Sequence, residues 1–179
     1  MIVGLRSSAA RAVEVEAVSP PEVLFLCTGN SCRSQMAEGW ARRLWGDRLV
    51  ARSAGLLAHG LNPHAVRVMA EAGVDISGHR SKTLAEVDVG ALDVVVSVCG
   101  HADETCPTLP GRVRRVHFGF DDPPRLAAGE ADPERALGHY RRVRDEVRDL
   151  VARLPEVTGL PLGPLPDGAA RSPLPEGGA

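Results

Sequence analysis

The segment Cys27–Ser34 combines residue types that can hold an anion beside a reactive sulfur. It reads Cys-Thr-Gly-Asn-Ser-Cys-Arg-Ser and joins an apolar run to a helical pattern. Small residues, Gly29 among them, let successive backbone N–H groups turn inward, and the start of the helix adds its positive dipole end. Arg33 can grip two oxygens in a fixed fork. This field is expected to make a Cys27 thiolate available near neutral pH.

We expect Cys27 to be a nucleophile at a bound oxyanion. Ser34 is expected to donate a hydrogen bond to the sulfur, and Asn30 to brace the loop from within. Taken alone, Cys27 could be a core cysteine, but a Cys with an Arg six positions later across a strand-to-helix turn favours an anion site. A nucleotide-binding P-loop is excluded because no Gly-Lys-Ser/Thr ends the loop. The residues assigned to oxyanion binding are Thr28, Gly29, Asn30, Ser31, Cys32, Arg33 and Ser34.

Short apolar runs alternate with helical patterns along the chain, as in parallel strands linked by crossover helices. The first run, residues 23–26, is apolar at every position, which is typical of a strand covered on both faces. Further strands are expected at residues 49–53, 92–98 and 113–118. We therefore predict an α/β fold, a single domain with a four-stranded parallel sheet flanked by helices.

Capping residues and periodic apolar positions predict the helices. One begins near Ser34, and the last begins at Asp132-Pro133. Residues 83–86 match a capping box that opens a short helix. Another helix begins at the Asn62-Pro63 cap, and the residues expected on its buried face are Val66, Met69 and Ala70.

Reactive residues follow three of the predicted strands. Cys27 follows the first, Cys99 follows the third, and Asp121-Asp122 follows the fourth. Ligands of open α/β sheets bind at the carboxyl ends of the strands. We therefore expect these side chains to meet at one edge of the sheet.

The bulk composition indicates one domain and no general affinity for polyanions. The chain has 179 residues, 44% of them hydrophobic, and a net charge of -2 from 21 basic and 23 acidic residues. Binding to nucleic acid or to an anionic membrane is therefore not expected. No apolar run approaches the roughly 18 residues of a membrane span, so we expect a cytoplasmic protein, and a monomer. Four cysteines in that compartment suggest packing, metal binding or redox catalysis.

The two ends of the chain differ from its middle. Residues 1–22 are expected to form a flexible extension, and residues 155–179, with six prolines and five glycines, a disordered tail. Residues 23–154 then form the catalytic domain.

Over this middle part, the sequence resembles the low-molecular-weight tyrosine phosphatase superfamily, whose signature is a Cys, five residues, an Arg and then Ser or Thr. It is more similar to the thioredoxin-coupled arsenate reductases within it. The matching segments are Cys27–Gly39, Ser53-Ala54-Gly55, Asn62-Pro63, Asp75-Ile76-Ser77, Cys99, Cys106-Pro107 and Phe120-Asp121-Asp122-Pro123.

The resemblance implies a reductase with a relay of three thiols. Cys27 attacks arsenate, Cys99 attacks the arsenic-bearing sulfur, and Cys106 moves the disulfide outward to reduced thioredoxin, the electron donor. Cys99 and Cys106 are seven residues apart, about 10.5 Å in a continuous helix, whereas a disulfide tolerates roughly 7 Å between Cα atoms. The segment 100–105 must therefore bend or unwind. Phosphate and sulfate are expected to compete as oxyanions.

The resemblance also bears on side chains outside the relay. Asp122 matches the general acid, although Asp-Asp-Pro-Pro alone could be a polar turn. Some relatives bind potassium through Asn, Glu, Ser and a later acid. Here Asn30, Glu38 and Ser53 match, but Lys82 replaces the acid, so we expect no bound cofactor, metal ion or potassium requirement. The isolated histidines His59, His79 and His101 are assigned no role.

Three alternative functions remain. A phosphatase acting on phosphotyrosine or small phosphate esters would use the same anion loop. A metal or arsenite sensor would use the cysteines with His101, although Arg33 opposes a cation in the loop. A mycothiol- or glutaredoxin-coupled reductase would need fewer relay cysteines than this chain has.

Overall fold

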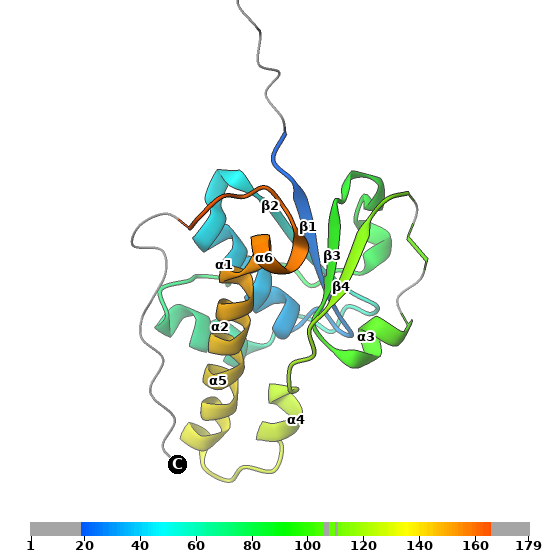
Figure 1. Cartoon of the computed structure of the whole chain (residues 1–179). Coiled ribbons are helices and arrows are strands. Elements are labelled where there is room, and N and C mark those ends of the chain that lie inside the picture. The colour runs from blue at the N-terminus through cyan, green and yellow to red at the C-terminus, as the bar shows by residue number, and fades with distance from the viewer. Residues whose placement is uncertain (1–18, 106–107, 110, 166–179) are drawn as a thin grey trace, which may run out of the picture.

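The computed structural model of the chain describes residues 19–105, 108–109 and 111–165 (Figure 1). Its four strands form one parallel sheet in the order β2-β1-β3-β4, which confirms the predicted fold class. The strands are β1 (Glu22–Cys27), β2 (Val50–Gly55), β3 (Val94–Ser97) and β4 (Arg114–His117). The helices are α1 (Arg33–Trp45), α2 (Pro63–Glu71), α3 (Gly100–Thr105), α4 (Pro123–Ala127), α5 (Pro133–Ala152) and α6 (Leu154–Thr158), with 3-10 turns η1 (Gly46–Arg48), η2 (Leu84–Glu86) and η3 (Val89–Ala91).

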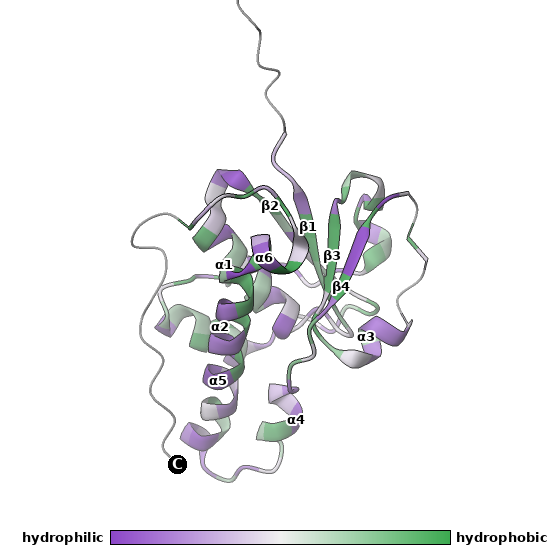
Figure 2. Cartoon of the chain, viewed as in Figure 1, coloured by the Kyte–Doolittle hydropathy of each residue, from purple (hydrophilic) through white to green (hydrophobic). Residues whose placement is uncertain are grey.

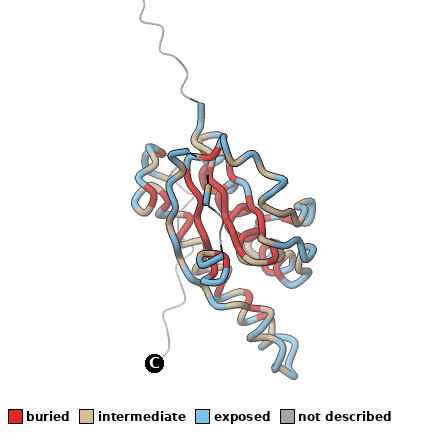
Figure 3. Tube along the Cα trace, turned by 90° about the vertical axis from the view of Figure 1, so that its right-hand side faces the viewer, coloured by how far each residue is buried: buried red, intermediate tan, exposed pale blue. Residues whose placement is uncertain are grey.

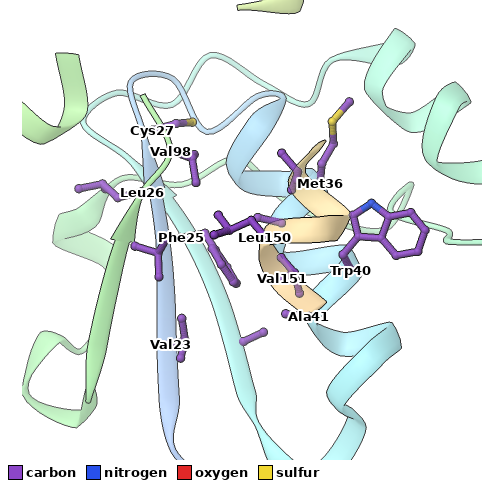
Figure 4. Packing of buried hydrophobic residues seen from close by; sticks show 14 of the residues in the cluster. Val23, Phe25, Leu26, Cys27, Met36, Trp40, Ala41, Val98, Leu150 and Val151 are labelled. Carbon is purple, nitrogen blue, oxygen red and sulfur yellow. The ribbon is translucent and has the colours of Figure 1, made fainter. Parts of the chain in front are cut away.

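β1 is a central strand, and its apolar sequence is explained by burial on both faces. All four residues from Val23 to Leu26 are fully buried (Figure 3). Phe25 points toward Leu150 and Val151 of α5, whereas Leu26 points to the opposite face (Figure 4). Because β1 lies inside the sheet, its carboxyl end at Cys27 is held in a fixed position for the loop that follows.

β4 is one of the two edge strands, with β2 at the other edge, and it is the most exposed of the four. Arg114, Arg115 and His117 are exposed, so this strand is the hydrophilic one in Figure 2. Charged residues on an edge strand prevent further strands from pairing with it.

α1 and α5 pack together over one face of the sheet, and two tryptophans of α1 connect them. The Trp40 indole N–H donates to the Arg144 carbonyl at 3.2 Å, and the Trp45 indole N–H donates to the Val151 carbonyl at 2.8 Å. A buried indole needs such a partner for its N–H group. These bonds hold the second half of α1 against α5, the longest helix.

The predicted cap at Asn62 is present, but the predicted buried face of α2 is partly wrong. The Asn62 side chain accepts hydrogen bonds from the N–H groups of His64 and Ala65. The buried residues of α2 are Ala65, Val68 and Met69, while Ala70 is exposed. The buried face of α2 is thus shifted by about one residue toward the N-terminus relative to the prediction. The contacts of α2 with α5 decide which face is covered.

The ordered chain extends past the predicted boundary at Leu154. Residues 155–165, assigned from sequence to the disordered tail, include most of α6 and the buried side chain of Leu162. Arg48 donates hydrogen bonds to the carbonyls of Leu162 and Pro164, at 3.0 and 2.8 Å. Contacts with η1, more than 100 positions earlier in the chain, therefore order this segment in spite of its many prolines and glycines. Residues 1–18 and 166–179, which complete the two predicted extensions, lie outside the described residues.

None of the helices within the described ranges is long and apolar enough to cross a membrane.

Candidate active site

The loop between β1 and α1 is braced from beneath by Asn30. This residue has φ 44°, in the left-handed region, and it is fully buried. Its side-chain NH2 donates to the hydroxyls of Ser34 and Ser53, both at 2.9 Å, and its carbonyl oxygen accepts from the Lys82 N–H at 2.9 Å. Asparagine tolerates this conformation better than most residues because its short side chain can bond locally. The loop is therefore tied to β2 and to the segment before η2.

Cys27 lies at the beginning of this loop with its sulfur next to Ser34. Cys27 Sγ and Ser34 Oγ are 2.8 Å apart, and the cysteine is 3% exposed. Because Ser34 already accepts a hydrogen bond from Asn30, its own proton is available to the sulfur. A thiolate at Cys27 would thus have a hydrogen-bond donor inside the protein.

A cavity of about 280 Å³ opens above the sulfur. The loop residues that line it include five of the seven assigned to oxyanion binding, whereas the side chains of Asn30 and Ser34 lie beneath the loop. Those two residues support the cavity rather than line it. The complete lining is Cys27, Thr28, Gly29, Ser31, Cys32, Arg33, His59, Asp122 and Pro124.

Arg33 and Asp122 close one side of the cavity as an ion pair. Arg33 Nη2 lies 3.0 Å from Asp122 Oδ1, and Arg33 Nη1 donates to the Phe120 carbonyl at 2.9 Å. The Asp122 carboxylate is 41% exposed, and the residue directly precedes α4, whose first residue is Pro123. The loop after β4 thus brings Asp122 to the anion site, as predicted from its place after a strand.

Cys99 lies at the same edge of the sheet. It follows β3, is 4% exposed, and its sulfur is 3.4 Å from the Thr28 hydroxyl. Cys27, Cys32 and Cys99 are free thiols. Burial raises the pKa of the Cys32 thiol, so this cysteine is held in its neutral form. Cys106, the third relay residue of the prediction, lies outside the described residues.

The comparison with known families decides what kind of anion loop this is. Residues 22–157, which contain the loop, Cys99 and Asp122, match the sequence pattern described as low molecular weight phosphotyrosine protein phosphatase. The chain belongs to this family. The match confirms the resemblance to this family noted from the sequence, and it extends to residue 157 in α6, beyond the predicted end of the domain at Leu154.

Within the phosphatase family, the similar proteins include named arsenate reductases. The arsenate reductase of Halalkalibacterium halodurans is 50% identical over 125 residues, which cover 70% of this chain and 88% of that protein. A solved arsenate reductase in the oxidized state has a TM-score of 0.63 at 32% identity, covering 74% of this chain and 95% of that one. The thioredoxin-dependent arsenate reductase of Corynebacterium glutamicum has a TM-score of 0.54 at 28% identity, covering 75% and 61%.

In this member of the family, His59 lines the anion cavity, although the sequence alone indicated no role for it. The segment that follows β2 runs beside the loop, and the His59 N–H donates to the Gly29 carbonyl at 3.0 Å. A Cβ on Gly29 would lie 2.5 Å from His59 Nδ1, so only glycine permits this contact. Pro124 of the lining was also missed. An isolated histidine carries no spacing signal, and only the fold brings it to the loop.

A second histidine that the sequence analysis set aside, His79, supports the loop through Gln35. His79 Nδ1 is 3.0 Å from Gln35 Oε1, and the Gln35 NH2 donates to Asn30 Oδ1 at 3.0 Å. Burial lowers the pKa of His79, which favours its neutral form. The buried network therefore continues from the loop to the segment after α2.

The carboxylate of Glu38 in α1 is buried and contacts three polar side chains. The Ser53 hydroxyl donates to Glu38 Oε2 at 2.5 Å, Lys82 Nζ lies 3.7 Å from the same oxygen, and Arg42 pairs with Oε1. A buried carboxylate needs such partners to offset its desolvation. Nowhere in the described part of the chain, this site included, do three His, Cys, Asp or Glu side chains group as metal ligands.

Proposed function

We propose that this protein reduces arsenate to arsenite with Cys27 as the nucleophile and a disulfide relay through Cys99 and Cys106 that reduced thioredoxin resets. The observation that carries the proposal is the second buried thiol beside the anion loop, with Cys99 Sγ 3.4 Å from the Thr28 hydroxyl. Hydrolysis of a phosphate ester through a cysteine needs one thiol and a proton donor. Reduction needs two electrons as well, and a second thiol next to the loop can supply one of them.

In the proposed first step, the Cys27 thiolate attacks arsenic and a sulfur–arsenic bond forms. One arsenate oxygen leaves, and Asp122 donates the proton that lets it leave as water. Arg33 binds two of the remaining oxygens, and the inward N–H groups of the loop stabilise the anion. The Ser34 hydroxyl, 2.8 Å from the sulfur, stabilises the thiolate before the attack.

In the second step, the Cys99 thiolate attacks the Cys27 sulfur. The sulfur–arsenic bond breaks, its electron pair stays with arsenic, and arsenite leaves as the two cysteines form a disulfide. The Cys106 thiolate then attacks the Cys99 sulfur and releases Cys27 as a thiolate. Two thiols of thioredoxin finally reduce the Cys99–Cys106 disulfide. The similarity to the thioredoxin-dependent arsenate reductase of Corynebacterium glutamicum supports this electron donor.

The proposal includes the setting in which the enzyme acts. We propose a cytoplasmic monomer, where cellular reductants keep the four cysteines reduced between turnovers. Phosphate and sulfate, which share the tetrahedral shape and charge of arsenate, are expected to bind as competitors. A phosphatase is the second candidate, because the family takes its name from phosphotyrosine hydrolysis.

Two assays on the same set of variants test the proposal. The first measures thioredoxin-dependent NADPH oxidation with arsenate, and the second measures hydrolysis of para-nitrophenyl phosphate. Cys27→Ser, Cys99→Ser and Cys106→Ser are each expected to abolish arsenate turnover, whereas only Cys27→Ser abolishes hydrolysis. Cys32→Ser is the matched control, because Cys32 is a buried thiol of the same loop that has no place in the relay, and it should keep most of its activity in both assays.

Peptide mapping of protein oxidised by one equivalent of arsenate complements these assays. A Cys99–Cys106 disulfide is expected. Full arsenate turnover in Cys99→Ser or Cys106→Ser, or a persistent Cys27–Cys32 disulfide, would show that the relay is wrong.

A further inference from the structure

We infer that Asp103 is a positioning residue that holds α3 against the sheet, and that its contacts with Ser97, Arg115 and His117 set how readily Cys99 and Cys106 form a disulfide. This inference rests on the proposed function, because it concerns the segment between the two relay cysteines. We call the contact of Asp103 with Ser97 and His117 the α3 latch.

The latch is a chain of hydrogen bonds from β4 through β3 to α3. Ser97, the last residue of β3, is 3% exposed, and its hydroxyl donates to Asp103 Oδ1 at 2.8 Å. His117 Nδ1 of β4 lies 2.9 Å from the same Ser97 oxygen. Since a hydroxyl has one proton, and here it goes to the carboxylate, the His117 N–H donates to Ser97. Two hydrogen bonds in series toward a carboxylate strengthen each other.

Arg115 of β4 adds a positive charge to the latch. Arg115 Nη2 donates to the Asp103 backbone carbonyl at 3.1 Å and lies 3.8 Å from the Asp103 carboxylate. His117 Nδ1 is also 3.8 Å from that carboxylate. Asp103 therefore collects contacts from both neighbouring strands through its side chain and its backbone.

α3 has little else to hold it in place. It has six residues, and His101, Glu104 and Thr105 are exposed. Ala102 is the one fully buried residue among them. A helix of this length does not form on its own in water, so its stability comes from tertiary contacts. Within the described residues, the Asp103 hydrogen bonds and the buried Ala102 side chain attach α3 to the sheet (Figure 1).

Disulfide formation must disturb the latch. Asp103 lies between the two relay cysteines, and its N–H donates to the Cys99 carbonyl at 3.2 Å in the first turn of α3. All six residues between the two cysteines lie in α3, and a continuous helix over their seven-residue spacing would separate the Cα atoms by about 10.5 Å, whereas a disulfide requires roughly 7 Å or less. The backbone that carries Asp103 must therefore rearrange as the disulfide forms. The latch then stabilises the dithiol form and shifts the redox equilibrium away from the disulfide.

The equilibrium with glutathione measures this effect directly. The full chain with Cys27 and Cys32 changed to Ser keeps Cys99 and Cys106 as its only thiols. In the titration, each of the two cysteines loses one proton and one electron, and one glutathione disulfide becomes two glutathione molecules. Ser97→Ala removes the latch donor without changing the sequence of α3. Asp103→Asn removes the carboxylate charge, and Glu104→Gln is the matched control, because it makes the same change at the next, exposed position.

Ser97→Ala and Asp103→Asn are each expected to shift the equilibrium five- to ten-fold toward the disulfide, because a hydrogen bond to a charged group is lost from the dithiol form. This corresponds to a potential that is about 20 to 30 mV more negative. Glu104→Gln is expected to stay within two-fold of its parent. A general loss of structure would not produce this pattern. To check that the anion loop is intact, each substitution is also made in the protein that keeps all four cysteines, and hydrolysis of para-nitrophenyl phosphate by that protein is measured.

The outcomes separate the latch from the relay. If the parent protein forms the Cys99–Cys106 disulfide and neither variant shifts its equilibrium, the latch is wrong and the proposed function stands. A shift in both variants away from the disulfide would also overturn the latch. If the parent forms no such disulfide at any glutathione ratio, the proposed relay fails and the latch fails with it.

Discussion

At the scale of single residues, buried polar side chains support the anion site. Glu38 is the buried acid among them, and its negative charge needs partners inside the protein. Its carboxylate is 3% exposed and contacts Ser53, Arg42 and Lys82. Removing one partner of a buried charge is costly because the remaining charge is left without compensation. The Lys82 ammonium is a cation already present at this carboxylate. A potassium ion bound there would have to share the site with a like charge.

We therefore predict that potassium does not stabilise the wild-type protein, whereas it stabilises Lys82→Asp. Replacing the ammonium by a carboxylate leaves two acidic groups near Asn30 and Ser53, which a bound cation would neutralise. Thermal unfolding in KCl and in NaCl at equal ionic strength measures the difference. We expect equal melting temperatures for the wild type and a rise of several degrees in KCl for the variant.

Arg80→Asp is the control for this experiment, because it makes the same charge change on a side chain that points to solvent two residues away. A strong potassium response of the wild-type protein would show that Lys82 does not replace the ion.

At the level of elements, α1 is connected to the segment after α2 through buried side chains rather than through backbone pairing. Gln35 of α1 contacts Asn30 in the loop, His79 and the Arg80 carbonyl. Burial is the largest effect on the pKa of His79 and lowers it. The nearby positive charges of Arg42 and Lys82 lower this pKa further, whereas the negative charges of Glu38 and Asp75 raise it by less than burial lowers it. The position of this segment therefore depends on an imidazole that is neutral in the folded protein.

This gives a prediction for stability against pH. The unfolded chain protonates His79 near the ordinary pKa of about 6.5, whereas the folded protein resists protonation until a lower pH. The stabilising contribution is thus fully present above about pH 6.5 and is lost as the pH falls toward the lowered folded value. Urea unfolding at pH 7.5 and 5.5 should show a smaller loss of unfolding free energy for His79→Gln than for the wild type.

His101→Gln serves as the control, because His101 is exposed on α3. This variant should lose as much stability as the wild type between the two pH values. An identical pH dependence in His79→Gln would contradict the assignment.

For the molecule as a whole, the chain after α6 closes the packed layer by returning to the end of α1 (Figure 1). Leu162 is 4% exposed, and Arg48 donates hydrogen bonds to the carbonyls of Leu162 itself and of Pro164. The Arg48 guanidinium also lies 5.1 Å from the Trp45 ring centre. Residues 159–165 therefore belong to the folded domain.

Two truncations test this boundary. A chain that ends at Leu165 should melt at the temperature of the full protein. A chain that ends at Gly159 loses the buried Leu162, which costs about 2 kcal/mol and lowers the melting temperature by about 4–8 °C. Differential scanning calorimetry of both proteins gives the comparison, and equal melting temperatures would show that the return segment contributes nothing.

The sequence by itself determined the elements whose cause is local. The apolar run of β1 requires burial on both faces, Asn62-Pro63 begins α2, and the Thr83–Glu86 capping box is present at η2. The order of residues from Cys27 to Ser34 determined the anion loop, because a strand end, small residues and a helix beginning lie next to one another in the chain.

Tertiary structure alone decided which distant side chains meet. Thr28 and Cys99 are 71 positions apart, Ser97 and His117 are 20 apart, and no spacing rule connects either pair. The buried face of α2 and the order of residues 155–165 were likewise decided by surfaces on other elements. Local patterns determine backbone conformation through short-range sterics and hydrogen bonds, whereas burial and side-chain pairing depend on how the strands and helices are arranged in space.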